Sequence, residues 1–332
     1  MYLGAQLPYD DDLFRFAKQM GVEGIDTSPA EDLGVQELGY WQADRLCQVR
    51  ERVESHGLRL EAMHLPLTSA GIHKQAWPSI MLGTAERDRD IDHCCKCIEA
   101  AAQAGIPLLL YNLAILPVVR TPERSPGRGG VTYSHFDYES LKNDPPLDVA
   151  PLTIDQAWER ITYFVERVIP VAEANGVRLG CHQHDPGMPG GAPYRGIHRV
   201  LGSLEGVKRF VALSDSPYHG LNFCQGTISE ICTSADQVYE AIRYFGQRKR
   251  IFWVHFRNIR GGMGAFDEVF PDEGDIDMLH ALRTYDEIGY KGAIIPDHVP
   301  HSELDSRWGH QARAFCLGYI RAMIQTIQRE PR

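Results

Sequence analysis

The sequence contains no long hydrophobic run. Its 332 residues include no uninterrupted apolar stretch near the roughly 18 residues that a membrane-spanning helix requires. The longest candidate, residues 106–116, contains proline and asparagine. The first residues lack the basic start and long apolar core of a signal peptide. We therefore expect a cytoplasmic protein that has no membrane partner.

Positive charge is also scarce. The chain carries 34 Lys and Arg residues against 44 Asp and Glu residues, which gives a formal net charge of −10. Such a field repels nucleic-acid phosphates and anionic membrane surfaces. The one dense basic run, Gln247–Arg250, is typical of a solvated helix end. We therefore expect no nucleic-acid partner.

The cysteines show neither a disulfide framework nor the pattern of a closed zinc site. Eight cysteines in a chain of this length are too sparse for a disulfide-rich scaffold. Cys94, Cys95 and Cys97 cluster, but a structural zinc site needs a second Cys-x-x-Cys pair, which the sequence lacks. They fall in Asp88–Gln103, where the apolar period predicts a helix with thiols at its packing face.

What the sequence does contain is a regular alternation of short apolar segments and helical patterns. Eight segments are predicted strands: Tyr2–Leu7, Gly24–Thr27, Leu58–His64, Ile106–Asn112, Val177–Gln183, Gly220–Cys224, Ile251–Asn258 and Gly292–Asp297. Further helical patterns lie between them: Asp11–Met20, Gln42–His56, Thr153–Asn175, Ser234–Phe245 and Asp277–Ile288. This alternation predicts an α/β protein, a single (β/α)8 TIM barrel over residues 1–332. A doubly wound open sheet is the alternative, but no Gly-x-Gly-x-x-Gly loop follows the first strand.

One segment interrupts the alternation. Residues 113–152 follow the fourth predicted strand, are rich in proline and arginine, and show no helical period. A loop of this length inside a compact domain is usually functional. In a barrel it leaves from the C-terminal face, where active sites are built. We therefore predict a mobile lid or substrate wall, with a disordered insertion as the alternative.

Metal-binding residue types stand at the ends of four successive predicted strands. These residues, separated by 42, 31 and 42 positions, are His182, Cys224, His255 and Asp297. Since each interval is about one βα unit, a barrel would bring all four side chains to one mouth. Two imidazoles, one thiolate and one carboxylate can hold a divalent transition metal. Each residue taken alone is more often part of the core or surface than a ligand.

The motifs around these residues resemble those of the D-mannonate dehydratase family. The similar segments are Cys181–Pro186, Cys224-x-Gly226, His255–Asn258, Phe266–Glu268, Gly274–Met278 and Pro296–His298, together with Tyr111–Asn112 and Arg120–Thr121. They follow in order from about His64 to the C-terminus.

The resemblance implies a TIM barrel of the xylose-isomerase-like type that uses Mn²⁺ or Fe²⁺. Its reaction would be removal of water from D-mannonate to give 2-keto-3-deoxy-D-gluconate. The four residues above would be the metal ligands, with zinc as an alternative metal after purification. His298 matches the family's proton-transfer histidine, and Arg257 matches a basic residue beside the carboxylate-binding region, so the resemblance makes both candidate catalytic residues. A salt bridge at the barrel rim is the other reading of Arg257.

Five further residues are candidates for binding the sugar acid. They lie at or after strand ends, in the long segment or in the shared motifs: His64, Asn112, Arg120, His184 and Asp275. Helix capping is an equally good explanation for one of the pair Asp275 and Asp277. We further expect a homo-oligomer.

Some positions depart from the family pattern. Ile295 stands where the family has arginine, Val299 replaces a glycine, and His184 replaces an aspartate. Trp308 aligns with a family tyrosine implicated in proton transfer, and an indole cannot shuttle a proton. Three alternatives therefore remain open: a lyase for another sugar acid or keto-sugar, a metal-dependent sugar isomerase or epimerase, and an inactive sugar-acid binder that has kept the metal.

Overall fold

The eight predicted strands form a closed parallel barrel. The computed structural model describes residues 1–29 and 33–330, and its strands join in the order β1-β12-β9-β8-β7-β4-β3-β2. The bounds are Tyr2–Pro8 (β1), Gly24–Ser28 (β2), Arg59–His64 (β3), Leu108–Tyr111 (β4), Arg178–His182 (β7), His219–Cys224 (β8), Ile251–His255 (β9) and Ala293–Ile295 (β12). The prediction of a TIM barrel is confirmed.

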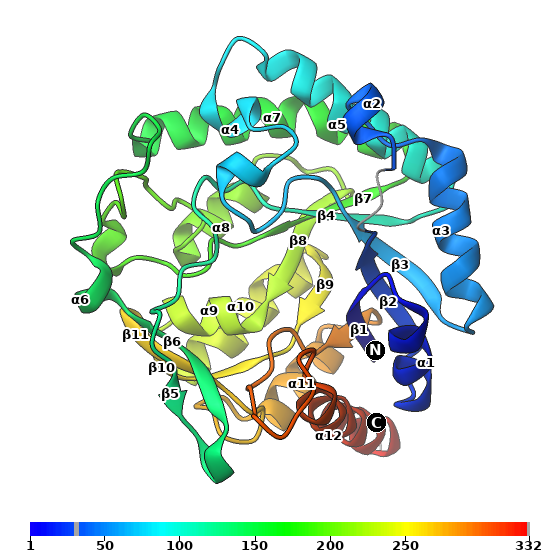
Figure 1. Cartoon of the computed structure of the whole chain (residues 1–332), viewed down its shortest axis with the longest axis vertical. Coiled ribbons are helices and arrows are strands. Elements are labelled where there is room, and N and C mark those ends of the chain that lie inside the picture. The colour runs from blue at the N-terminus through cyan, green and yellow to red at the C-terminus, as the bar shows by residue number, and fades with distance from the viewer. Residues whose placement is uncertain (30–32, 331–332) are drawn as a thin grey trace.

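Helices surround this barrel (Figure 1). Their bounds are Asp11–Gln19 (α1), Val35–Leu38 (α2), Ala43–Ser55 (α3), Ser79–Leu82 (α4), Arg87–Gln103 (α5), Tyr138–Leu141 (α6), Ile154–Asn175 (α7), Leu204–Val211 (α8), Gln225–Ile231 (α9), Ala235–Gln247 (α10), Met278–Glu287 (α11) and His310–Arg329 (α12). Thr153 begins α7 with a capping box in which its side chain and that of Gln156 bond each other's backbone N–H groups. Among the described residues, none of the helices is both long and apolar enough to cross a membrane.

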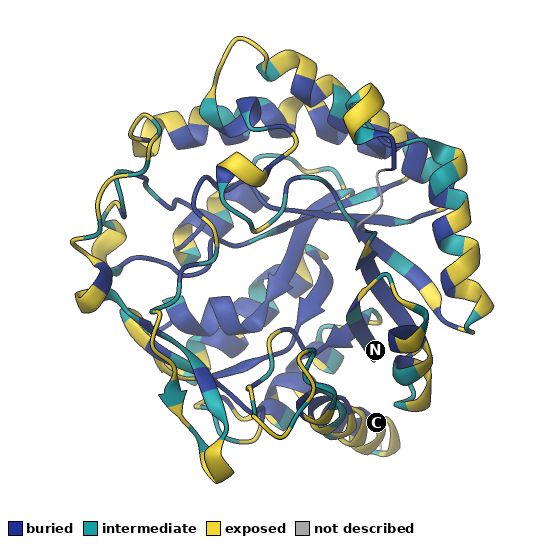
Figure 2. Ribbon diagram, in the orientation of Figure 1, coloured by how far each residue is buried: buried dark blue, intermediate teal, exposed yellow. Residues whose placement is uncertain are grey.

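The core fills the barrel and the layer between strands and helices. Inside the barrel, buried side chains form a plug: Ala62, Leu108, Leu110, Phe252, Trp253, Ala293 and Ile295. Figure 2 shows buried strands at the centre and helices whose exposed faces point outward. Because the interior is packed, it is not a pore, and polar chemistry is confined to the barrel ends.

The segment 113–152 is not the irregular loop that its composition suggested. It contains Ser125–Pro126 (β5), Thr132–Asp137 (β6) and the short helix α6. β6 pairs with β11 (Ala265–Val269), which pairs with β10 (Asn258–Gly262), so a four-stranded antiparallel sheet forms in the order β10-β11-β6-β5. The partner strands lie more than 100 residues later, which is why local sequence gave no sign of this pairing.

Candidate metal centre and active site

The four residues expected to bind a metal lie together at the C-terminal mouth of the barrel. Three are the last residues of β7, β8 and β9, and the fourth follows β12: His182, Cys224, His255 and Asp297. The strand register sets their level, since Cys224 lies opposite His255 and His255 lies opposite Ile295. One ligand atom of each lies within 4.8 Å of those of the other three.

Neighbouring groups prepare His182 and Cys224 for a cation. His182 Nδ1 lies 2.7 Å from the backbone oxygen of Gln183, a contact that makes Nδ1 the donor and leaves Nε2 free. Cys224 begins α9, and its sulfur accepts a hydrogen bond from the N–H of Thr227 at 3.4 Å. Burial opposes ionisation of the thiol, but Arg257 and the two histidines outweigh it and lower the pKa of Cys224 to about 5. The thiolate, the form that binds metals, therefore prevails at neutral pH.

His255 is the clearest sign that this cluster is built for an ion. Its side chain is buried, yet neither ring nitrogen has a hydrogen-bond partner among the described residues. Its Nδ1 lies 3.4 Å from Asp297 Oδ2. A buried polar atom without a partner is costly, and coordination would remove that cost. The donor set of two imidazoles, one thiolate and one carboxylate fits a divalent transition metal.

Arg257 is part of a buried network of ion pairs next to the four candidate metal ligands. Its Nη2 is 2.6 Å from Asp185 and 2.8 Å from Glu230, and its Nε is 3.2 Å from Asp297 Oδ2. The side chain is 2% exposed. Gly226 makes room for it, because a Cβ there would lie 2.4 Å from Arg257 Cγ. We therefore do not retain Arg257 as a group that touches substrate; it holds in place the carboxylate of Asp297, a candidate metal ligand.

Arg120 belongs to the same buried network instead of the substrate cavity. It contacts both oxygens of Asp185, at 2.5 and 3.0 Å, and its Nε is 3.1 Å from Glu268. Burial opposes ionisation of Asp185, but Arg120 and Arg257 hold its pKa well below the usual range. Glu230 shows the opposite behaviour, because burial and the charge of Asp185 raise its pKa well above the usual range.

His298 is placed to act on a molecule in the mouth. Its Nδ1 lies 2.9 Å from each carboxylate oxygen of Glu268, and its side chain is 41% exposed. Desolvation opposes protonation, but Asp297 and Glu268 raise the pKa of His298 to about 9. A cation on Asp297 would lower that pKa again, toward the range where a histidine exchanges protons at neutral pH.

A cavity of about 230 Å³ opens over the metal cluster. Its walls come from five strands, β1, β2, β3, β7 and β9, and from the loops after β3, β4, β7 and β12: Gln6, Ser28, His64, Thr68, Ser69, Asn112, Val118, His182, Asp185, His255, Asp297 and His298. The candidates His64 and Asn112 thus face this space, and His64 Nε2 lies 2.9 Å from Gln6 Nε2. Gln6 and Ser28 were missed, although their positions near the ends of β1 and β2 were a usable signal.

The other sequence candidates lie outside this cavity wall. His184 has both ring nitrogens bonded to backbone, at 2.8 Å to the oxygen of Leu113 and 3.3 Å to the N–H of Leu201. Burial lowers the pKa of His184 to about 3, so it stays neutral. We therefore do not retain it as a substrate ligand.

Asp275 and Trp308 have structural partners as well. Asp275 accepts a hydrogen bond from the N–H of Gly261 at 2.8 Å, whereas Asp277 caps α11. Asp275 is therefore not retained as a substrate ligand, and capping accounts for its neighbour. Trp308 packs edge to face on Phe16 and lies outside the cavity wall.

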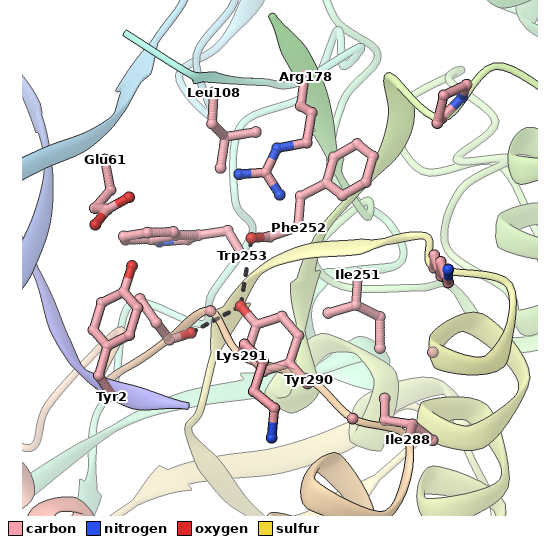
Figure 3. A pocket seen from close by; sticks show the side chains of 16 residues that line it. Tyr2, Glu61, Leu108, Arg178, Ile251, Phe252, Trp253, Ile288, Tyr290 and Lys291 are labelled. Atoms are coloured by element: carbon pink, nitrogen blue, oxygen red, sulfur yellow. Dashed lines mark hydrogen bonds between the residues drawn. The ribbon is translucent and has the colours of Figure 1, made fainter.

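A larger cavity of about 620 Å³ lies at the opposite end of the barrel (Figure 3). Its wall includes the first residues of five barrel strands: Tyr2, Leu108, Arg178, Ile251 and Ala293. Tyr290 closes part of it, with its hydroxyl 3.0 Å from the backbone oxygen of Ala293. None of the four candidate metal ligands lines this cavity, and in TIM barrels chemistry occurs at the C-terminal mouth. We therefore assign the active site to the smaller cavity.

Comparison with known proteins agrees with this geometry. A mannonate dehydratase from Thermotoga maritima is 28% identical over 340 residues, which covers 91% of this chain and 88% of the relative. A mannonate dehydratase from Streptococcus agalactiae serotype Ia is 31% identical over 287 residues, 78% of each chain. The crystal structure of mannonate dehydratase from Streptococcus suis serotype2 superposes with a TM-score of 0.84 at 24% identity, covering 100% of this chain and 96% of that one.

More distant barrels share the fold alone. The structure of 3-keto-D-glucoside 4-epimerase from E. coli superposes with a TM-score of 0.59 at 15% identity and covers 97% of this chain and 99% of that one.

The profile of the family described as D-mannonate dehydratase (UxuA) matches residues 12–153 and 149–332, which is nearly the whole sequence. This chain therefore belongs to the D-mannonate dehydratase family.

Proposed function

We propose that this chain is a metal-dependent hydro-lyase that converts D-mannonate to 2-keto-3-deoxy-D-gluconate. The observation that carries the proposal is the buried ligand set under a polar cavity, with His298 on the cavity wall. Family membership supports the substrate. The ligands would be His182, Cys224, His255 and Asp297, and their mixture of nitrogen, sulfur and oxygen favours Mn²⁺ or Fe²⁺, with Zn²⁺ able to compete.

The reaction requires transfer of protons beside a carboxylate. The hydrogen on C2 leaves as a proton, the hydroxyl on C3 leaves as water, and the resulting enol becomes the 2-keto acid. A bound divalent cation would supply positive charge that stabilises the anion developing at the reacting oxygens. His298 exchanges the proton, because its Nδ1 is held by Glu268 while its side chain is 41% exposed and lines the cavity.

Uncharged polar side chains would recognise the hydroxyl groups of the sugar acid. Gln6, Ser28, Thr68, Ser69 and Asn112 line the cavity and offer hydrogen bonds to hydroxyl groups. Arg120 and Arg257 are unavailable for this role, since their guanidinium groups pair with carboxylates of the protein.

An isomerase or epimerase is the second candidate. It is favoured by one observation: among the described residues that line the cavity there is no tyrosine, and Trp308 lies elsewhere. A cavity with His298 as its main proton carrier suits a single proton exchange at one carbon as well as it suits elimination. The expectations of a homo-oligomer and of a cytoplasmic location remain predictions.

A substrate panel separates these reactions. The protein is stripped of metal, reconstituted with Mn²⁺ and given a set of aldonates and keto-sugars, with keto acid detected by semicarbazide. We expect keto acid from D-mannonate, whereas epimerised sugar without keto acid would favour the second candidate. The variant His298→Asn should retain metal while kcat falls by about 10²–10⁴. The variant His73→Asn, on the turn after β3, is the control and should behave as the parent chain.

A further inference from the structure

Among the described residues, only Glu268 forms a hydrogen bond with the imidazole of His298. Both oxygens of Glu268 lie 2.9 Å from Nδ1, while Nε2 is 3.6 Å from Asp297 Oδ1. Paired with a carboxylate, Nδ1 carries the hydrogen, and only Nε2 can exchange a proton with a molecule in the cavity. The direction of that exchange thus depends on where Glu268 holds the ring.

Glu268 is itself held rigidly. It is 5% exposed, and its Oε1 lies 3.1 Å from Arg120 Nε and 3.3 Å from Arg257 Nη1. Asp185 bridges the two arginines, at 2.5 Å from Arg120 Nη1 and 2.6 Å from Arg257 Nη2. A carboxylate with this many charged partners has little freedom to turn.

The backbone of Glu268 is fixed by the segment 113–152. Glu268 lies opposite Ser134 of β6 on one side and opposite Ile259 of β10 on the other. β6 belongs to that segment, and so does Arg120. Figure 1 shows β6, β10 and β11 side by side at the edge of the barrel.

We propose that Glu268 is a positioning residue that directs Nε2 of His298 into the cavity, and that segment 113–152 is the scaffold that holds Glu268. This inference rests on the proposed function for the role of His298. Composition predicted a mobile lid or substrate wall; Val118 of the segment does line the cavity, and the inference adds the role of a support. The segment contributes to proton transfer through Arg120 and β6 without contacting the reacting atoms.

Replacement by glutamine discriminates this role from simple packing. In Glu268→Gln the amide oxygen keeps the Oε1 position facing Arg120, which only donates, so the amide nitrogen takes the Oε2 position, 2.9 Å from His298 Nδ1. One of the two acceptors of the Nδ1 hydrogen is then replaced by a donor, so the ring is held less firmly and is free to turn. Size and shape are kept, but the charge that pairs with Arg120 and Arg257 is lost, so the His298→Asn background is needed to isolate the part of the effect that passes through the imidazole.

The test is a double-mutant cycle on the Mn²⁺-loaded enzyme. Glu268→Gln should lower kcat for D-mannonate by about 10–100-fold, while KM and metal content change less than about threefold. In the His298→Asn background the same change should have no further effect, because the group that it orients is gone. Asp267→Asn is the matched control, since Asp267 neighbours Glu268 on β11 but bonds His135 at 2.7 Å and should leave kcat unchanged. Multiplying losses in the double variant would overturn the positioning role.

A crystal structure of Glu268→Gln gives a readout that does not need activity. We expect the His298 ring to be rotated or disordered while the metal ligands stay in place. A ring in the parent orientation would overturn the inference even if the enzyme dehydrates D-mannonate. Conversely, full activity of His298→Asn would remove the proposed proton carrier, while a turned ring in Glu268→Gln would still show that Glu268 sets its orientation.

Discussion

The buried network next to the four candidate metal ligands contains two carboxyl groups, those of Asp185 and Glu230. Replacing the first by its amide should destabilise the protein strongly, whereas replacing the second should have little effect on stability. Asp185 is ionised and accepts from Arg120 at 2.5 and 3.0 Å, from Arg257 at 2.6 Å and from Thr227 Oγ1 at 3.3 Å. Burial and repulsion from Asp185 raise the pKa of Glu230 well above its usual range, and we predict from this direction that Glu230 is protonated. Asp185→Asn removes a charge that both arginines need, whereas Glu230→Gln exchanges one neutral group for another.

The expected difference is large. Breaking one partner of a buried ion pair costs about 3–5 kcal/mol, so Asp185→Asn should lower the free energy of unfolding by that amount. Glu230→Gln should cost less than about 1 kcal/mol, because hydrogen bonding is retained. At about 2 °C per kcal/mol for a chain of this size, the melting temperatures should fall by about 6–10 °C and by less than about 2 °C. Thermal unfolding at pH 7 measures both, and equal losses for the two variants would refute the assigned charges.

Three further outcomes follow from single contacts. Gly226→Ala should cost about 1–3 kcal/mol and weaken metal binding in titration calorimetry, because its Cβ would lie 2.6 Å from Arg257 Cζ. Cys224→Ala should reduce metal content, measured by elemental analysis, from about one ion per chain to almost none, while Cys232→Ala keeps it. Burial lowers the pKa of His219 to about 4, so its stabilising effect is complete above about pH 6.5 and is lost as pH falls toward 4. His219→Gln should therefore flatten the acid branch of the stability curve by about 3 kcal/mol, and an unchanged slope would contradict the buried neutral ring.

Much of the fold could be predicted because its signals are local. Alternating apolar strands and amphipathic helices need only neighbouring residues to be recognised, and each strand end could be placed within a few positions. The metal-binding candidates followed from the same periodicity, since one residue type per βα unit defines a ring at the barrel mouth.

The network behind the ligands could not be predicted from such signals. Arg120 and Glu268 are 148 positions apart and meet only because β6 pairs with β11 outside the barrel. Without that pairing, Arg120 in an irregular segment was interpreted as a substrate ligand and Arg257 at a strand end as a catalytic residue. His184 was misread for the same reason, because its backbone partners Leu113 and Leu201 come from two distant loops.

The central claim is that the four-ligand cluster supports dehydration of D-mannonate. Its most direct test is proton NMR of D-mannonate incubated in D2O with the Mn²⁺-reconstituted chain, beside the metal-stripped chain. We expect 2-keto-3-deoxy-D-gluconate to accumulate only with metal, and to carry deuterium at C3, where the enol takes up solvent hydrogen. Failure to form the keto acid with metal present, or equal formation by the stripped chain, would contradict the account.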